Sequence, residues 1–171
     1  MRPIEPSDRP RLAEQLLDSW GSELVVSRGH LHRPIEQPGF VAADDDAWMG
    51  FATYEIVAQE MEITTLASGV RNRGAGAALL AACVAVAHER GLQRVWLVTT
   101  NDNVHALRFY QRRGFVLVAL RRGAIDEARR TLKPEIGLLG EDGIPIRDEL
   151  ELELPIAEWP AFVERYRWPP S

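Results

Sequence analysis

The chain has 171 residues, of which 46% are hydrophobic and 26% charged, so it can bury a core and has the composition of an ordinary soluble globular protein. Its formal net charge of −5 argues against a nucleic-acid-binding protein, because neutralising phosphates requires clusters of basic residues. The one cysteine, Cys83, cannot form an intramolecular disulfide, and no signal peptide or membrane-length apolar run is visible, so we expect a cytoplasmic protein without a membrane partner.

The first 68 residues predict one helix followed by three strands. Residues 7–20 place Leu12, Leu16 and Leu17 on one helical face. Residues 28–39 hold two prolines and two glycines, so we expect an irregular segment there. Residues 39–68 are typical of three strands, with turns at the acidic run 44–46 and near residues 58–60.

The second half alternates between helix and strand. Residues 74–90 predict a helix that ends before Gly91, residues 94–100 a buried strand, and residues 101–113 a second helix. Residues 115–120 are a further strand, and the alternation of leucine and glutamate in residues 149–154 predicts a half-buried one. These elements indicate a mixed α/β or α+β fold on a mostly antiparallel sheet. The long segment between the last two strands predicts a functional insertion at about residues 121–148.

The stretch VRNRGAGAA, residues 70–78, raises the question of a phosphate site. Where a strand enters a helix through small residues, the free N–H groups of the first turn form an anion site. A Walker-type loop needs a lysine where Ala77 stands, and a dinucleotide fingerprint needs a small residue where Leu79 stands. Arg71, Gly74 and Gly76 match a third form, a pyrophosphate-binding turn, although a turn that only needs small residues has the same pattern.

A second motif follows this turn at a spacing of about thirty residues: Asn103, Ala106, Phe109-Tyr110 and Gly114-Phe115. In this order and spacing the chain, from about residue 40 to 154, resembles the GNAT superfamily of acetyl-CoA-dependent N-acetyltransferases. The resemblance implies a single GNAT-like domain over residues 1–171. It also implies a mixed, mostly antiparallel sheet that is splayed at the cofactor site and flanked by helices.

The resemblance also assigns the binding residues and the cosubstrate, acetyl-CoA, and it implies no metal. Leu66 and Ser68 are expected to contact the pantetheine arm through their backbone, the turn to hold the pyrophosphate, and Asn103 to bond the pantetheine or orient the second helix. The residues expected to contact acetyl-CoA are Leu66, Ser68, Arg71, Arg73, Gly74, Ala75, Gly76, Ala77, Asn103 and Tyr110.

Two residues are expected to carry the chemistry. Tyr110 is the candidate general acid for the departing thiolate, and its alternative role is that of a buried tyrosine bonded to a backbone carbonyl. Glu62 is the candidate base that accepts a proton from the amine, directly or through water, and its alternative is a solvated strand carboxylate. His30 and His32 are expected to be surface loop histidines, because no further metal ligands stand near them in the sequence.

The expected partner is the primary amine of a small molecule or peptide, with no nucleic acid. The alternative function is a non-catalytic CoA-binding or regulatory domain of the same fold. The insertion at residues 121–148 mixes apolar and charged residues, which suits either a homodimer surface or a lid over the acceptor site.

Overall fold

A computed structural model describes residues 1–44, 47–68 and 74–166 of the chain. The strands are β1 (Arg2–Pro3), β2 (Val25–Ser27), β3 (His30–His32), β4 (Gly39–Asp44), β5 (Ala47–Val57), β6 (Glu60–Ser68), β7 (Arg94–Thr100), β8 (Val116–Arg121) and β9 (Glu149–Pro155). The helices are α1 (Arg9–Trp20), α2 (Ala75–Glu89), α3 (Val104–Gln111), α4 (Ala124–Thr131) and α5 (Trp159–Tyr166). Within the described residues, no helix is both long and apolar enough to cross a membrane.

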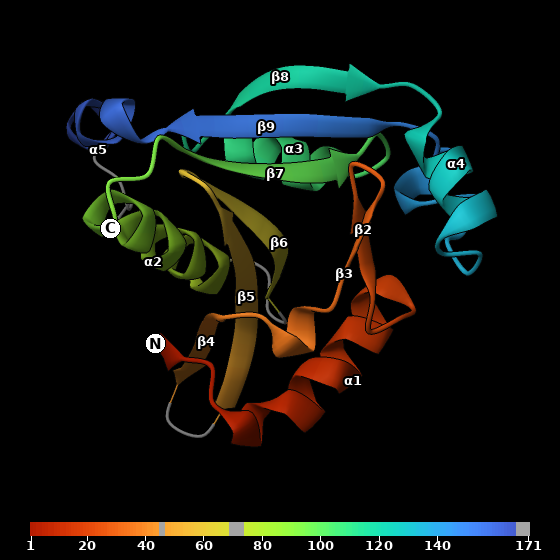
Figure 1. The fold of residues 1–171 in the computed structure, drawn as a ribbon, viewed down its shortest axis with the longest axis horizontal. Helices are drawn as coiled ribbons and strands as arrows, with labels where there is room; N and C mark the ends of the chain where they lie inside the picture. Colours follow the sequence, from red (N-terminus) through yellow and green to blue (C-terminus); the bar gives the residue numbers. More distant parts are fainter. Residues whose placement is uncertain (45–46, 69–73, 167–171) are drawn as a thin grey trace.

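Seven strands form one sheet in the order β1-β4-β5-β6-β7-β9-β8, and β2 and β3 form a separate hairpin (Figure 1). All neighbouring pairs of the large sheet are antiparallel except β6 and β7, which are parallel. The mixed, mostly antiparallel sheet predicted from the sequence is therefore confirmed.

The parallel pair separates soon after it begins. β6 and β7 are paired only from Glu60 opposite Arg94 to Glu62 opposite Trp96, although both strands continue. On its other edge, β6 shifts register against β5 between the pairs Tyr54–Ile63 and Thr53–Thr65, which leaves Thr64 as an extra residue. Because a bulge of this kind bends its strand, it accounts for the divergence of β6 from β7. The splayed sheet expected at the cofactor site follows from this bulge.

Helices cover both faces of the sheet. Successive strand residues point to opposite faces, so Phe51 of β5 packs with Leu12 and Leu16 of α1, whereas Ala52 joins the larger cluster around Leu79 of α2. α3 contributes Tyr110 to that same larger cluster. These two clusters pack α1, α2 and α3 against the sheet.

One sequence-based expectation differs from the structure. Residues 28–39 are not wholly irregular, because β3 pairs with β2, with Val26 opposite Leu31. The hairpin that results packs against β6. The segment between β8 and β9, which the sequence predicted to be an insertion, contains α4 and a short bridge between Leu139 and Pro145.

Candidate active site

The splayed strands enclose a cavity of about 550 Å³. Residues 63–66 of β6 and 97–100 of β7 form two of its walls, and Asn103, Ala106 and Tyr110 of α3 border it. Since the two strands no longer bond to each other here, their inner backbone edges face the cavity. An extended ligand could therefore add hydrogen bonds between them as a further strand would.

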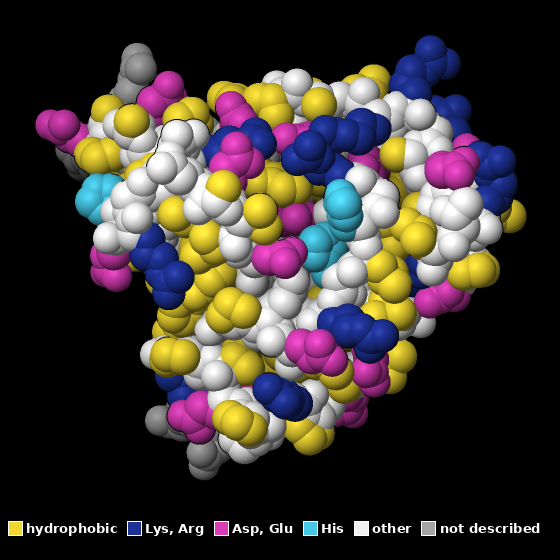
Figure 2. Space-filling model, viewed as in Figure 1, with side chains coloured by type: hydrophobic (Ala, Val, Ile, Leu, Met, Phe, Trp, Pro, Cys, Tyr) yellow, Lys and Arg dark blue, Asp and Glu magenta, His cyan; other side chains and the backbone are white. Residues whose placement is uncertain are grey.

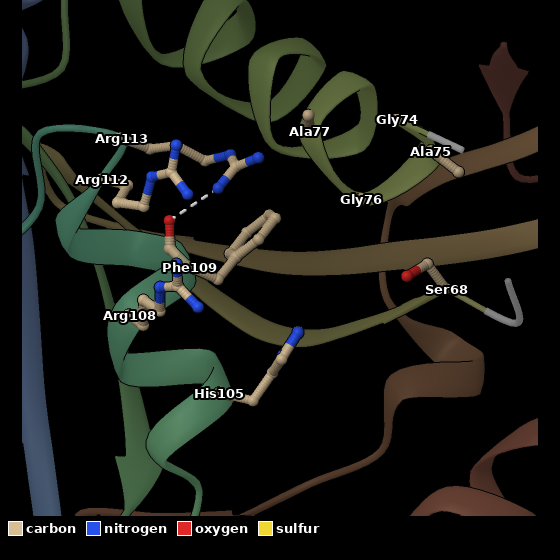
Figure 3. Close-up of a pocket in the computed structure, with 10 residues that line it drawn as sticks. All are labelled: Ser68, Gly74, Ala75, Gly76, Ala77, His105, Arg108, Phe109, Arg112 and Arg113. Atoms are coloured by element: carbon tan, nitrogen blue, oxygen red, sulfur yellow. Dashed lines mark hydrogen bonds between the residues drawn. The ribbon is translucent and has the colours of Figure 1, made fainter. Parts of the chain in front are cut away.

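A second pocket, of about 330 Å³, lies between the start of α2 and the side of α3 (Figure 3). The first intrahelical bond of α2 runs from the amide of Ala78 to the carbonyl of Gly74, so the amides of residues 75–77 are left without helical partners. Together with the positive end of the helix dipole, these amides form an anion site. Gly74 has a φ of +76°, a conformation that favours glycine.

The facing side of α3 is strongly basic. His105 and Arg108 of α3 line this second pocket, together with Arg112 and Arg113, which directly follow the helix (Figure 3). The Arg113 guanidinium lies 3.7 Å from the centre of the Phe109 ring and donates to the Phe109 carbonyl over 2.8 Å, so it is held in place. The pocket therefore suits an anionic group. Arg71 and Arg73, expected at the same turn, lie outside the described residues.

The two hollows are neighbours along the same two elements. Leu66 of β6 lines the cavity and Ser68 lines the second pocket, while on α3 Tyr110 lines the cavity and Phe109 the pocket. The structure thus brings together the described residues that the sequence expects to contact the cofactor. Asn103 is the N-cap of α3, where its side-chain oxygen accepts from the amide of Ala106 over 2.9 Å.

Tyr110 is a buried residue that borders the cavity. Its ring contacts Phe109 edge to face, with centroids 5.1 Å apart, and Phe115 at 5.6 Å. Burial, and to a lesser extent the neighbouring thiol of Cys83, raises the pKa of the Tyr110 phenol above its usual range. The phenol therefore stays protonated at neutral pH and can donate a hydrogen bond.

Glu62 is the last residue of β6 that pairs with β7, immediately before the residues that line the cavity. It is buried, and its carboxylate accepts a hydrogen bond from the hydroxyl of Ser27 on the hairpin. Burial raises the pKa of Glu62, while the bond from Ser27 and the nearby His32 oppose this shift. Of the two environments considered from the sequence, the solvated strand carboxylate is wrong.

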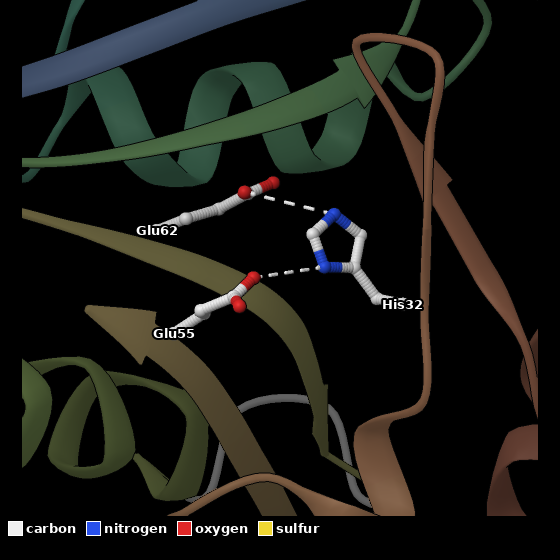
Figure 4. Close-up of side chains that lie close together, drawn as sticks. All are labelled: His32, Glu55 and Glu62. Carbon is white, nitrogen blue, oxygen red and sulfur yellow. Dashed lines mark ion pairs between the residues drawn. The ribbon is translucent and has the colours of Figure 1, made fainter. Parts of the chain in front are cut away.

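His32 also differs from its expected environment. It is not a surface histidine but is only 7% exposed. Its Nδ1 lies 3.3 Å from a carboxylate oxygen of Glu55, and its Nε2 lies 3.6 Å from one of Glu62 (Figure 4). The expectation failed because the hairpin folds back against β6, which brings residues distant in sequence into contact. Figure 2 shows histidine and acidic side chains gathered near the centre of the face where the hairpin lies.

Within the described residues, His32, Glu55 and Glu62 are also the group whose potential ligand atoms lie within 4.8 Å of one another, close enough to hold a metal ion. However, the two carboxylates approach opposite ring nitrogens (Figure 4). An imidazole binds a metal ion through one nitrogen lone pair, whereas here each ring nitrogen has a carboxylate of its own as its nearer partner. The donor set fits a hydrogen-bonded cluster better than a metal site.

Sequence reasoning missed a second buried carboxylate at the cavity. Glu149 of β9 is 1% exposed and lines the cavity, and it accepts a bond from the backbone amide of Arg28 over 3.2 Å. Burial raises its pKa. Glu151 is buried as well, within 3.4 Å of Arg94 and 2.5 Å of Arg121. The leucine-glutamate alternation predicted a strand with one solvated face, but the hairpin and these arginines cover that face.

The insertion forms another wall of the cavity. Lys133, the one lysine of the chain, is 4% exposed, and its ammonium donates to the carbonyls of Trp20 over 3.1 Å and Leu24 over 2.7 Å. Burial lowers its pKa. Other insertion residues that line the cavity are Ile125, Glu135, Ile136, Gly137, Leu139, Gly140 and Ile146. Only the tertiary structure brings these residues to the site.

Comparison with known proteins identifies the family to which this architecture belongs. The family model described as "Acetyltransferase (GNAT) family" matches residues 4–115. Among curated proteins, the uncharacterised protein YxbD of Bacillus subtilis (strain 168) is 42% identical over 134 residues, which cover 78% of this chain and 84% of YxbD.

Two solved structures share the fold. The IAA acetyltransferase from Bacillus cereus ATCC 14579 superimposes with a TM-score of 0.71 at 22% identity, over 90% of this chain and 97% of that chain. An acetyltransferase from Bacillus subtilis, crystallised in complex with CoA, superimposes with a TM-score of 0.60 at 24% identity, over 70% of this chain and 76% of that chain. The order of the two motifs, the splayed sheet and the family match all point to the same family.

Proposed function

This chain belongs to the GNAT family of acetyltransferases, and we propose that it moves an acetyl group from acetyl-CoA to a primary amine of a small molecule or peptide by direct transfer in the cytoplasm. The observation that carries the proposal is the cavity between β6 and β7, which adjoins an anion site at the start of α2. A long ligand with a pyrophosphate in its middle and a thioester at one end matches that pair of hollows.

The proposed position of acetyl-CoA follows from the shape and charge of the two pockets. The pantetheine arm lies between the splayed strands and bonds to the backbone at Leu66 and Ser68. The amides of residues 71–77 hold the pyrophosphate, with Arg71 and Arg73 at the rim. Arg108 of α3 and Arg112, directly after that helix, line the same pocket and add positive charge near the phosphates. Asn103 acts by capping α3, which orients Tyr110.

The proposed reaction is attack of a neutral amine on the thioester carbonyl. A backbone amide near Leu66 stabilises the tetrahedral oxyanion, and Tyr110 donates a proton to the departing thiolate. An alkyl ammonium has a pKa of about 10.4, so the acceptor must lose a proton first. Glu62, whose pKa burial raises, takes that proton directly or through a water molecule.

Isothermal titration with acetyl-CoA and CoA, followed by thiol release across a panel of amines, tests the proposal. We expect binding of both ligands and thiol release with at least one amine. Failure to bind either ligand would exclude the acetyltransferase. Binding without thiol release from any amine would favour the alternative, a non-catalytic CoA-binding or regulatory domain.

For the whole chain, we propose one domain over residues 1–171 with the insertion at about 121–148 acting as a lid over the acceptor. Its position in the cavity wall supports the lid over a homodimer surface. Sedimentation of a variant lacking residues 124–146 tests the two roles. The lid predicts an unchanged number of chains per particle with altered amine preference, and the dimer surface predicts dissociation.

A further inference from the structure

The cavity between the splayed strands reaches both faces of the sheet. Leu152 of β9 belongs to the core cluster that contains Tyr110 of α3, so its side chain points to the face on which α3 packs. Successive residues of a strand point to opposite faces, so Glu149, at the start of β9, points to the other face, where it is bonded to the hairpin. Because Tyr110 and Glu149 both line the cavity, it connects the side of the anion site with the side of the hairpin.

The acceptor therefore has to approach from the hairpin side. With CoA held at the start of α2, as proposed above, its pantetheine arm enters from the α3 side and its thioester points toward the hairpin. The walls there come from the end of α1, from β2 and from the insertion, and they include the apolar residues Val25, Val26 and Ile136. Lys133 is the one cationic residue among the described residues of the walls, and its ammonium is bonded to two backbone carbonyls.

Glu149 is a buried carboxylate of this surface that forms no ion pair within the described part of the chain. It is 1% exposed and accepts a hydrogen bond from the backbone amide of Arg28. Two arginines act on it electrostatically, but both are paired with Glu151, Arg28 at 3.7 Å and Arg121 at 2.5 Å. Burial still raises the pKa of Glu149. Since an ionised carboxylate in a buried site is costly without a cation beside it, Glu149 favours a ligand with a positive group.

The hairpin holds the carboxylates of Glu62 and Glu149 close to each other. The hydroxyl of Ser27 donates to Glu62, and the amide of the next residue, Arg28, donates to Glu149. The negative charge of Glu62 also acts on Glu149 electrostatically. The acetyl transfer proposed above needs one base, which is Glu62. Glu149, which itself lines the cavity, is then available to bind the acceptor.

We propose that the acceptor carries a second cationic group besides the amine that is acetylated, as a diamine does, and that Glu149 binds this second group. The inference rests on the proposed acetyl transfer with Glu62 as base. The second ammonium donates to Glu149 and stays charged throughout, so Glu149 neither gains nor loses a proton. The other nitrogen, after giving its proton to Glu62, forms the bond to the acetyl carbon as the C–S bond breaks. The carbon chain between the two nitrogens lies against the apolar walls.

A series of amines tests this inference on the wild-type chain. Linear diamines of four to eight carbons are compared with the monoamine and the amino acid of the same length, which replace the second ammonium by a methyl group or a carboxylate. A hydrogen bond between charged groups is worth roughly tenfold to a hundredfold in affinity. At the best length we expect kcat/KM for thiol release to be higher for the diamine than for the monoamine by that factor, mainly through KM. The amino acid should be the poorest of the three.

Glu149→Gln and Glu153→Gln assign this preference to one residue. Glu153 points to the same face of β9 but does not line the cavity, so it is the matched control. We expect the ratio of kcat/KM between diamine and monoamine to fall to about one in Glu149→Gln and to persist in Glu153→Gln. Isothermal titration of the diamine into the CoA-bound chain should show a Kd raised by the same factor in Glu149→Gln alone. An unchanged Kd for acetyl-CoA reports an intact fold.

Several outcomes would overturn the inference. One is an equal kcat/KM for diamine and monoamine at every length, and another is thiol release with other amines but with none of the diamines. A preference for the diamine that persists in Glu149→Gln would also overturn it. If Glu149→Gln does not bind acetyl-CoA, Glu149→Asp replaces it: the shorter carboxylate should move the best diamine to a longer chain, and an unmoved optimum would contradict the assignment. If the wild-type chain binds acetyl-CoA but releases no thiol with any amine, the proposed function itself is wrong.

Discussion

Replacing Gly76 with alanine separates two reasons for a glycine in the first turn of α2. A Cβ at this position would meet Ser68 Oγ at 3.5 Å and carbon atoms of Leu66 and Phe109 at 3.6 Å, which are ordinary contact distances. The fold therefore does not require glycine there. Because alanine favours a helix over glycine, we expect Gly76→Ala to raise the free energy of unfolding by roughly 0.5–1 kcal/mol.

The same methyl group should weaken the binding of CoA. Gly76 lines the pocket beside the free amides of the helix terminus, and a methyl group there holds a phosphate away from them. A hydrogen bond to a charged group contributes about 1.5–3 kcal/mol. Losing one such bond raises the Kd for CoA by about tenfold to a hundredfold. The variant should thus be more stable and yet bind more weakly.

Thermal unfolding and isothermal titration with CoA measure the two effects on the same sample. Ala85→Gly is the matched control, because Ala85 is an exposed position of α2 beyond its first turns. We expect this control to lose about 1 kcal/mol of stability and to keep the wild-type Kd. An unchanged Kd for Gly76→Ala would refute the phosphate site at this turn. It would support the alternative, a turn whose small residues serve only the local fold.

Three further predictions concern the chemistry and the insertion. Tyr110→Phe keeps the ring contacts but removes the proton donor, so kcat should fall by about 100-fold with little change in the Kd for acetyl-CoA; an unchanged kcat removes Tyr110 from the acid role. Burial raises the pKa of Glu62, so activity should be lost as the pH falls through a value above the ordinary 4.5. In Glu62→Gln this part of the pH–rate profile should vanish, whereas the part that reports deprotonation of the amine should remain. Lys133→Met leaves two backbone carbonyls without their donor, which should lower the free energy of unfolding by about 1–3 kcal/mol and speed amide exchange in residues 124–146; unchanged exchange would show that Lys133 does not hold the insertion.

Much of the fold follows from local patterns in the sequence. The small residues after β6, the apolar run of α2 and the cap at Asn103 each depend on neighbours within a few positions, so the helices and the strands beside them are predictable. The order of the two motifs, from Gly74 to Phe115, identified the family for the same reason. A family match of this kind depends on spacing along the chain, which is visible without a structure.

The chemical environment of the site depends on tertiary structure instead. The sequence named Glu62, but its burial and its bond from Ser27 arise only when the hairpin folds against β6. The exposure of Glu149 was misjudged because the alternation along a strand marks its two faces and does not show that another element covers the second face. Burial and charge depend on contacts between residues far apart in the chain, and it is these contacts that set the pKa of Glu62 and connect it to His32.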